Sequence, residues 1–296
     1  MVQLFGKEEG KFHPISTVGL VATARWMNLN DLQPAINWLN SQGINVKIGG
    51  NIDTKLGQLA GNGIQKALEF NDLLHDPEVD ALWAVRGGYG SVKMVDHIDW
   101  DFWLKRPKPL IGFSDVTMIH AKASKRGIPS IHGEMLLNFF KDEQLQNGIL
   151  PALELASGKA WSYSWENSNH QRNGKAQGML VGGNLSVLVS NLGSLSEFDY
   201  QGKILLLEDL DEYLYHIDRM METLKRAGRL EKLAGLVVGG LTDMKDHQVE
   251  FGKQAEEIVW EAVSKYSYPV AFGAPFGHLP NQMPVRLGRT VELLVD

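Results

Sequence analysis

The chain has 296 residues, of which 44% are hydrophobic and 22% charged, with a formal net charge of −6 and no cysteine. The length favours two domains, and an acidic balance without a basic stripe argues against nucleic acid and anionic membranes as partners. The lack of cysteine excludes a thiol nucleophile, a thiolate metal site and disulfides. Since no secretory signal or bilayer-spanning run is visible, we expect a cytoplasmic protein.

Strand-like and helix-like segments alternate along the first half of the chain. Short apolar runs predict buried strands, and apolar residues at helical spacing predict the helices between them. The predicted strands cover 16–24, 44–48, 79–85 and 109–113, and the predicted helices cover 31–42, 62–75, 91–98 and 115–126. We expect Asn30 to cap the first helix, with Gln33 as its capping-box partner. This alternation is typical of an α/β fold, with a parallel sheet between layers of helices.

The composition changes between residues 158 and 175, where polar residues without helical periodicity predict a connection that contains some strand. An α/β pattern then restarts. The predicted strands cover 179–181, 203–207, 234–238, 269–273 and 291–295, and the predicted helices cover 185–192, 214–227 and 249–265. We therefore expect an N-terminal domain, 1–157, and a C-terminal domain, 176–296.

A serine stands at the junction between the fourth predicted strand and the helix that follows it. Gly112 leaves room for a sharp turn, on which Ser114 would expose its hydroxyl and direct backbone N–H groups at the group that it attacks. The simpler alternative is an N-cap, because a serine before a helix usually caps it. Val116 also stands where the α/β-hydrolase pattern has glycine, so this stretch alone does not identify a nucleophile.

A serine nucleophile needs a base, usually histidine, and a carboxylate that orients the base. Among nine histidines, His278 stands out because it follows a predicted strand in a loop rich in glycine and proline, and Glu208 ends another apolar strand. A surface histidine and an exposed strand-end carboxylate are the alternatives, and Glu212 competes with Glu208 for the role of the acid. The other histidines, including His120 and His132 in or near the helix after the serine, are expected to pack, hydrogen-bond or face solvent.

Two glycine-rich turns offer binding groups. The loop 87–90 is either a structural turn or an oxyanion hole, in which the Gly88 N–H joins the N–H of Asp115. Its spacing fits neither a dinucleotide-binding turn nor a P-loop. Asn184 either contacts substrate or caps the helix that follows it. No pair or cluster of histidines has metal-ligand spacing, so we expect no metal site.

Taken together, six segments resemble the LD-carboxypeptidases, the serine peptidase family that includes muramoyltetrapeptide carboxypeptidases and microcin C immunity peptidases. The segments are 84–91, 112–117, 182–185, 207–209, 217–219 and 276–278. The resemblance implies a flavodoxin-like or amidotransferase-like parallel-sheet N-terminal domain and a smaller C-terminal α/β domain. It also implies Ser114 as nucleophile, His278 as base, Glu208 as orienting acid, no metal or organic cofactor, and a homodimer.

The activity that the resemblance implies is release of the terminal D-alanine from a cytoplasmic murein tetrapeptide, a small peptide substrate. Hydrolysis of a peptidyl-aminoacyl nucleotide of the microcin C type, a non-catalytic module that binds wall peptides and a nucleotide-binding α/β protein are the alternatives. The chain departs from the family pattern at 22–25, where the family often has Ala-Pro-Ser, and around 59–63. Both departures bear on substrate specificity more than on chemistry.

Overall fold

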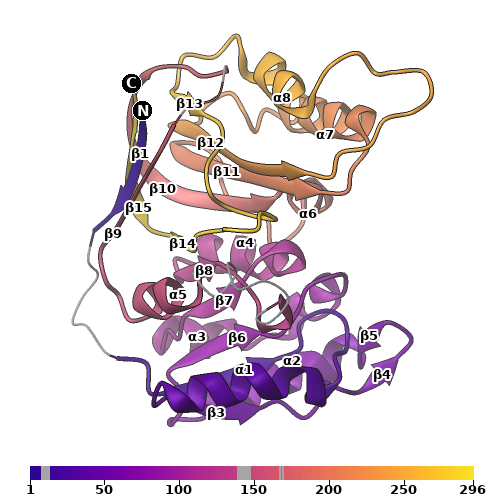
Figure 1. Cartoon of the computed structure of the whole chain (residues 1–296), viewed down its shortest axis with the longest axis vertical. Coiled ribbons are helices and arrows are strands. Elements are labelled where there is room, and N and C mark those ends of the chain that lie inside the picture. The colour runs from indigo at the N-terminus through magenta and orange to yellow at the C-terminus, as the bar shows by residue number, and fades with distance from the viewer. Residues whose placement is uncertain (8–13, 139–147, 167, 169) are drawn as a thin grey trace.

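The computed structural model describes residues 1–7, 14–138, 148–166, 168 and 170–296. It has the mixed α/β architecture that the alternating pattern predicts. Two main sheets lie one above the other in Figure 1, and the two chain ends meet beside the upper one. Within the described ranges, no helix combines the length and the apolar character that a bilayer crossing requires.

The lower, six-stranded sheet contains five parallel strands and one antiparallel edge strand. Its order across the sheet is β3-β2-β6-β7-β8-β14. The bounds are β2 (Thr17–Val21), β3 (Asn45–Ile48), β6 (Ala81–Ala84), β7 (Leu110–Gly112), β8 (Ser130–His132) and β14 (Val285–Leu287). A small separate hairpin joins β4 (Lys55–Leu56) to β5 (Leu59–Ala60).

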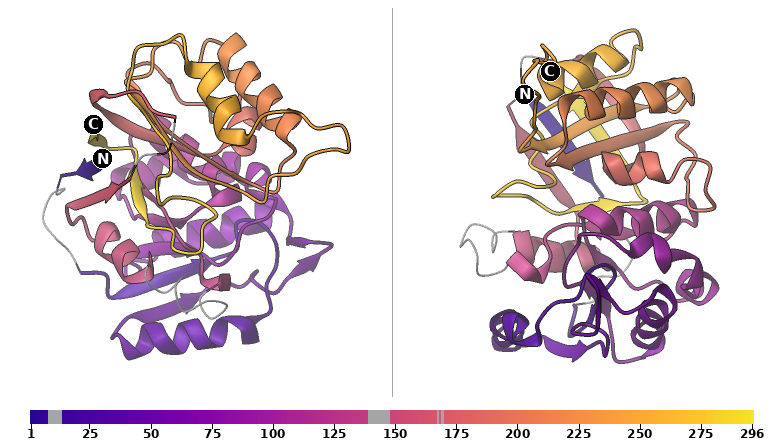
Figure 2. Two further views of the ribbon diagram at one scale, coloured as in Figure 1. Left: turned by 45° about the horizontal axis from the view of Figure 1, so that its top comes forward. Right: turned by 90° about the vertical axis from the view of Figure 1, so that its right-hand side faces the viewer.

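Helices cover both faces of this sheet, because successive residues of each strand point to opposite sides. α1 and α5 pack in one hydrophobic cluster with Leu20 and Ile111, whereas α2, α3 and α4 pack in another with Val21 and Leu110. The right-hand view of Figure 2 shows the two layers on opposite sides. The bounds are α1 (Leu29–Ser41), α2 (Gly63–His75), α3 (Trp100–Lys105), α4 (Thr117–Lys125) and α5 (Ile149–Ala156), with short 3-10 turns η1 (Ser91–Lys93), η2 (Val95–His97), η3 (Ser114–Val116) and η4 (Leu136–Asn138).

The seven-stranded sheet has a parallel half and an antiparallel half, in the order β13-β12-β11-β10-β15-β1-β9. The bounds are β1 (Val2–Gly6), β9 (Trp161–Trp165), β10 (Gly174–Asn184), β11 (Lys203–Leu210), β12 (Gly235–Thr242), β13 (Val270–Ala271) and β15 (Thr290–Val295). β10 to β13 are parallel, and β15, β1 and β9 continue the sheet antiparallel. The helices are α6 (Leu185–Ser190), α7 (Leu214–Arg226) and α8 (Ala255–Val263), with α7 and α8 side by side on one face (Figures 1 and 2).

Each sheet contains a strand from the opposite end of the chain. β1, at the N-terminus, pairs with β15 in the seven-stranded sheet, and β14, near the C-terminus, pairs with β8 in the six-stranded sheet. The expected boundaries of 1–157 and 176–296 therefore divide the chain differently from the sheets. The predicted connection contains the strand β9 and the start of β10.

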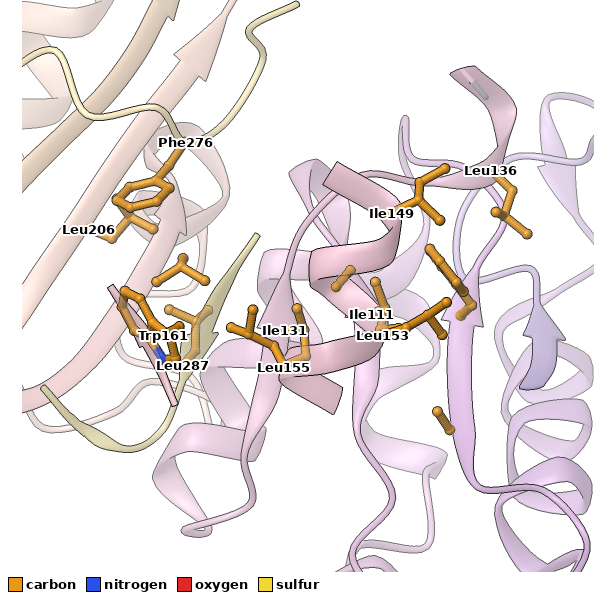
Figure 3. Close-up of a cluster of buried hydrophobic side chains, with 14 of the residues drawn as sticks. Ile111, Ile131, Leu136, Ile149, Leu153, Leu155, Trp161, Leu206, Phe276 and Leu287 are labelled. Carbon is orange, nitrogen blue, oxygen red and sulfur yellow. The ribbon is translucent and has the colours of Figure 1, made fainter. Parts of the chain in front are cut away.

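One hydrophobic cluster runs from one sheet into the other. It includes Leu206 and Phe276 from the seven-stranded side and Ile111 and Ile131 from the six-stranded side, with Leu287 of β14 between them. Figure 3 shows these side chains as one continuous row. Because burial of apolar surface is the main stabilising term in folding, this row fixes how the sheets sit relative to each other.

Several local predictions were wrong in detail. α1 begins at Leu29, and its cap is Asn28, whose side chain accepts a hydrogen bond from the Asn30 N–H, so the Asn30–Gln33 capping box does not form. The predicted helix 91–98 is two 3-10 turns, η1 and η2. α8 begins at Ala255 rather than at 249, because a capping box between Gln254 and Glu257 fixes its start.

Candidate active site

Ser114 lies on a sharp turn between β7 and α4. Its φ is +61°, a left-handed conformation that is uncommon for a residue with a side chain, and its side chain is half-buried. A Cβ atom at Gly112 would lie 3.0 Å from both Ala84 Cβ and Val116 Cγ2, so the backbone packs tightly where β7 enters the turn. The N-cap of α4 is Val116, and no side-chain hydrogen bond caps this helix. The capping alternative for Ser114 is therefore wrong.

A buried carboxylate and a half-buried histidine form a close pair. Glu208, near the end of β11, is fully buried, and its Oε2 lies 2.6 Å from the Nδ1 of His278 in the loop after β13. Gly277 permits this contact, because its φ is +90° and a Cβ atom there would lie 2.5 Å from Glu208 Cβ. The acceptor oxygen holds the proton on Nδ1, which directs the other ring nitrogen, Nε2, away from the carboxylate.

The pKa values of Glu208 and His278 are shifted in opposite directions by their contact. Burial raises the pKa of Glu208, but His132 and His278 beside it outweigh burial and bring the pKa down to about 2. Burial lowers the pKa of His278, and the bond to Glu208 with the charges of Asp209 and Glu134 raises the pKa above its ordinary value. Glu208 is therefore ionised at neutral pH and stabilises the protonated imidazole.

The histidine lies beside the turn that carries the serine. The ring of His278 packs on the ring of Phe113, with 4.7 Å between the ring centroids, and Phe113 directly precedes Ser114. In the described part of the chain, no hydrogen bond joins Ser114 to His278. The residues that the sequence predicted as nucleophile, acid and base thus lie in one region, with Ser114 just after β7, Glu208 near the end of β11 and His278 in the loop after β13.

Glu212 is not the residue beside His278. Its carboxylate is hydrogen-bonded to the Nδ1 of His216, four residues further along the chain. Of the two carboxylates that the sequence left in competition, Glu208 is the one bonded to His278. Only the first of the two lies against the loop that contains His278.

His132 is a site residue that the sequence reasoning missed. It lies on β8, is fully buried, and its Nε2 is 3.7 Å from Oε1 of Glu208, so the carboxylate lies between two histidines. Neither ring nitrogen of His132 has a hydrogen-bond partner among the described residues. We expected this histidine in or near the helix after Ser114, because the three-residue strand β8 was not predicted. A short apolar run after Gly127 was the signal that could have revealed it.

His120 is hydrogen-bonded to the backbone before Ser114, as expected for a packed histidine. Its Nε2 lies 2.8 Å from the Gly112 carbonyl oxygen and its Nδ1 lies 2.8 Å from Ser130 Oγ. A carbonyl can only accept, so Nε2 carries the proton and Nδ1 accepts from the serine hydroxyl. Burial lowers the pKa of His120 to about 3, which keeps the ring neutral.

The glycine-rich loop lies against Ser114. A Cβ atom at Gly87 would be 3.3 Å from Ser114 Oγ, so the loop backbone approaches the hydroxyl closely. The loop is tied down at its far end, where the Ser91 N–H donates to the carboxylate of Asp115 at 2.8 Å and Lys66 Nζ donates to the Gly90 carbonyl at 2.9 Å. These contacts hold the backbone of the loop beside the turn that carries Ser114.

Asn184 occupies the capping position that was its alternative role. Its side-chain oxygen accepts from the Val187 N–H at the start of α6, and its amide donates to Asp209 at 2.8 Å. Its backbone N–H donates to Thr117 Oγ1 at 3.0 Å, which ties β10 to α4. The side chain is buried. Substrate contact by Asn184 stays a prediction that none of these bonds supports.

Metal ligands are not gathered at this site. In the ranges that the structure describes, no group of three or more histidine, cysteine, aspartate or glutamate side chains is placed to hold a metal ion. Beside Ser114 the structure instead places a carboxylate–imidazole pair and the backbone of a glycine-rich loop. This set fits nucleophilic attack on a carbonyl followed by acyl transfer.

Comparison with known proteins places both halves of the chain in one family. Residues 18–133 match the LD-carboxypeptidase N-terminal domain, and residues 177–293 match the LD-carboxypeptidase C-terminal domain. The probable murein peptide carboxypeptidase of Bacillus subtilis is 32% identical over 92% of this chain and 86% of its own length. The Escherichia coli microcin C7 self-immunity protein MccF is 24% identical over 78% of this chain and 75% of its own length.

A solved structure shows the same fold. The crystal structure of the muramoyltetrapeptide carboxypeptidase from Oxalobacter formigenes matches with a TM-score of 0.84 and 26% identity, over 95% of this chain and 99% of that one. The match spans both sheets, since it covers nearly the whole of each chain.

Proposed function

Because the chain belongs to the LD-carboxypeptidase family, we propose that it is a serine peptidase that releases the terminal D-alanine from a murein tetrapeptide. The observation that carries the proposal is the buried Glu208–His278 pair, 2.6 Å apart, beside a serine on a strained strand-to-helix turn. The substrate class rests on the relatives, two of which are described as murein peptide or muramoyltetrapeptide carboxypeptidases.

The proposed reaction proceeds through an acyl-enzyme. Ser114 Oγ attacks the carbonyl carbon of the scissile amide, and Nε2 of His278 takes the hydroxyl proton. Collapse of the tetrahedral intermediate breaks the C–N bond, and the same proton goes to the departing amine of D-alanine. Water then attacks the ester carbonyl and gives a proton to His278. The C–O bond to Ser114 breaks, the shortened peptide acid leaves, and His278 passes the proton to Oγ, which restores the Ser114 hydroxyl. Glu208 stays ionised throughout and stabilises the imidazolium.

The backbone N–H groups of Gly88 and Asp115 are proposed to hold the oxyanion of the tetrahedral intermediate. The close approach of Gly87 to Ser114 Oγ supports this assignment. Loss of one such donor typically costs about 10²- to 10³-fold in rate. A backbone donor is removed by exchanging an amide for an ester at that position, which tests the role without a change of side chain.

We also propose that the six-stranded sheet belongs to a flavodoxin-like N-terminal domain and the seven-stranded sheet to a C-terminal α/β domain. The order β3-β2-β6-β7-β8 is 2-1-3-4-5 along the chain, the order typical of flavodoxin-like sheets. A homodimer and a cytoplasmic location complete the proposal. Light scattering of the purified protein and cell fractionation test these last two points.

Incubation with L-Ala-γ-D-Glu-meso-diaminopimelate-D-Ala, followed by mass spectrometry, tests the proposed activity. The parent protein should release one alanine, and Ser114→Ala should release none. A peptidyl-aminoacyl nucleotide in a parallel reaction tests the microcin-type alternative, for which the similarity to MccF is the argument. Cleavage of the nucleotide conjugate alone would overturn the murein assignment while keeping the hydrolase.

A further inference from the structure

Two arginines lie past the ends of neighbouring parallel strands, at the same sheet edge as the nucleophile. Arg25 follows β2 and Arg86 follows β6, and these strands pair directly. Nη1 of Arg86 donates to the Trp26 carbonyl at 3.0 Å, which holds the two segments together. The strand order reverses its direction along the sheet between β2 and β6, and open α/β sheets bind ligands in the crevice at such a switch point.

Neither arginine has a counter-charge in the described part of the chain. Arg126 and Arg229, by contrast, form ion pairs with Asp101 and Glu197. Nε of Arg25 and Nε of Arg86 are both buried, and neither has a hydrogen-bond partner among the described residues.

Two neighbouring cations without an anion are costly at such a site. Burial lowers the pKa of Arg86, and the positive charge of Arg25 lowers it further because the two guanidinium groups repel each other. Charges that are taken out of water usually have a partner. A bound anion would supply the missing partner.

The anion would lie close to the reacting bond. A Cβ atom at Gly88 would lie 2.6 Å from Arg25 Cδ and 2.7 Å from Arg25 Nε, so the arginine packs on the face of this glycine. The preceding residue, Gly87, is the one that approaches Ser114 Oγ. The arginine and the nucleophile therefore flank the same two-residue stretch of backbone.

We propose that Arg25 and Arg86 form the subsite for the free α-carboxylate of the residue that is released. This inference rests on the proposed function. In a terminal amide, one carbon atom separates the carboxylate from the scissile nitrogen, so the carboxylate must lie within a few ångströms of the oxyanion. Guanidinium groups bind carboxylates through paired, charge-assisted hydrogen bonds. The subsite would make the enzyme select for a chain end.

A matched pair of substrates tests the subsite. The tetrapeptide with a free C-terminal carboxylate is compared with the same peptide as a C-terminal amide, and kcat/KM is measured for both. The parent should favour the free acid by about 10- to 100-fold, the range expected for a charge-assisted hydrogen bond. Arg25→Ala should lower kcat/KM for the acid by about that factor, leave the amide unchanged and so remove the preference. Arg25→Lys should restore part of it.

Arg226→Ala, a change at an exposed position on α7, is the control and should leave both values unchanged. The melting temperature distinguishes binding from a structural role, because removal of one of two repelling cations should not lower it. Equal cleavage of acid and amide by the parent would overturn the subsite alone. An equal loss of kcat/KM on both substrates in Arg25→Ala, together with a lower melting temperature, would also overturn the subsite. A parent that cleaves neither peptide would overturn the proposed function and the subsite with it.

Discussion

Replacement of Glu208 by glutamine tests the electrostatic core of the mechanism. The change keeps the shape of the side chain and removes its charge. The pKa of Glu208 lies at about 2 instead of 4.5, mainly because two histidines offset the effect of burial. At about 1.4 kcal/mol per pKa unit, this corresponds to about 3 kcal/mol in favour of the ionised form. The share of this interaction that comes from His278 also stabilises its imidazolium when the ring holds the serine proton.

Because His132 supplies part of the shift, about 3 kcal/mol is an upper limit to this loss, and a loss of that size lowers the rate by about two orders of magnitude. A glutamine amide that turns its NH₂ toward His278 also forces the ring into the wrong tautomer, and in other triads this raises the loss to about 10⁴-fold. We therefore expect Glu208→Gln to lower kcat by about 10²- to 10⁴-fold, with little change in KM because the side chain does not reach the substrate.

The pH profile gives an independent readout. His278 must be neutral to accept the serine proton, so kcat/KM should fall on the acid side as pH drops through its pKa. Glu208 raises that pKa. Glu208→Gln should therefore move the acid limb to lower pH while it lowers the plateau.

Glu212→Gln is the matched control, because Glu212 pairs with His216 and not with His278. The assay is initial-rate hydrolysis of the tetrapeptide over the pH range. Unchanged activity in Glu208→Gln, or a loss confined to Glu212→Gln, would refute the assignment. An acid limb that stays in place would refute the electrostatic explanation.

Three further changes probe the geometry. Ser114→Ala should give a folded protein with no turnover, checked by circular dichroism and the tetrapeptide assay, and measurable turnover would remove Ser114 as nucleophile. Gly277→Ala should lower the free energy of unfolding by about 1–3 kcal/mol and disable catalysis, because φ is +90° and the new Cβ would lie 2.5 Å from Glu208 Cβ. Gly193→Ala is the control: its φ of +75° is also strained, but no atom of the described residues lies near the new Cβ, so catalysis should stay intact. His132→Phe should raise the pKa of Glu208 and slow the reaction, since the neighbouring imidazole that lowers this pKa is lost; an unchanged pH profile would argue against that role.

The three strand-end residues were predictable because each follows a local pattern. An apolar run that stops at a polar residue indicates a functional side chain near the end of a strand, and this pattern precedes Ser114 and Glu208, whereas His278 follows a predicted strand in a loop rich in glycine and proline. The family resemblance then assigned their roles. Physical proximity was not visible in any of these stretches, because it depends on how β7, β11 and the loop after β13 pack together.

The strands that the sequence did not predict form through pairing between residues far apart in the chain. β1 pairs with β15 across almost the whole chain, and three-residue strands such as β8 and β14 are too short to show a period of two. His132 was misplaced for that reason. The Asn28 cap was missed because Asn28 and Asn30 both suit a helix start, and only the backbone conformation decides between them.

Treatment of the protein with a fluorophosphonate, followed by peptide mass spectrometry of the modified residue, tests directly whether Glu208 and His278 activate Ser114. We expect a single adduct on Ser114 in the parent, none in Ser114→Ala, and strongly slowed labelling in His278→Ala, since the hydroxyl loses its base. Labelling at another serine, or an equal rate without His278, would contradict the claim that Glu208 and His278 activate Ser114.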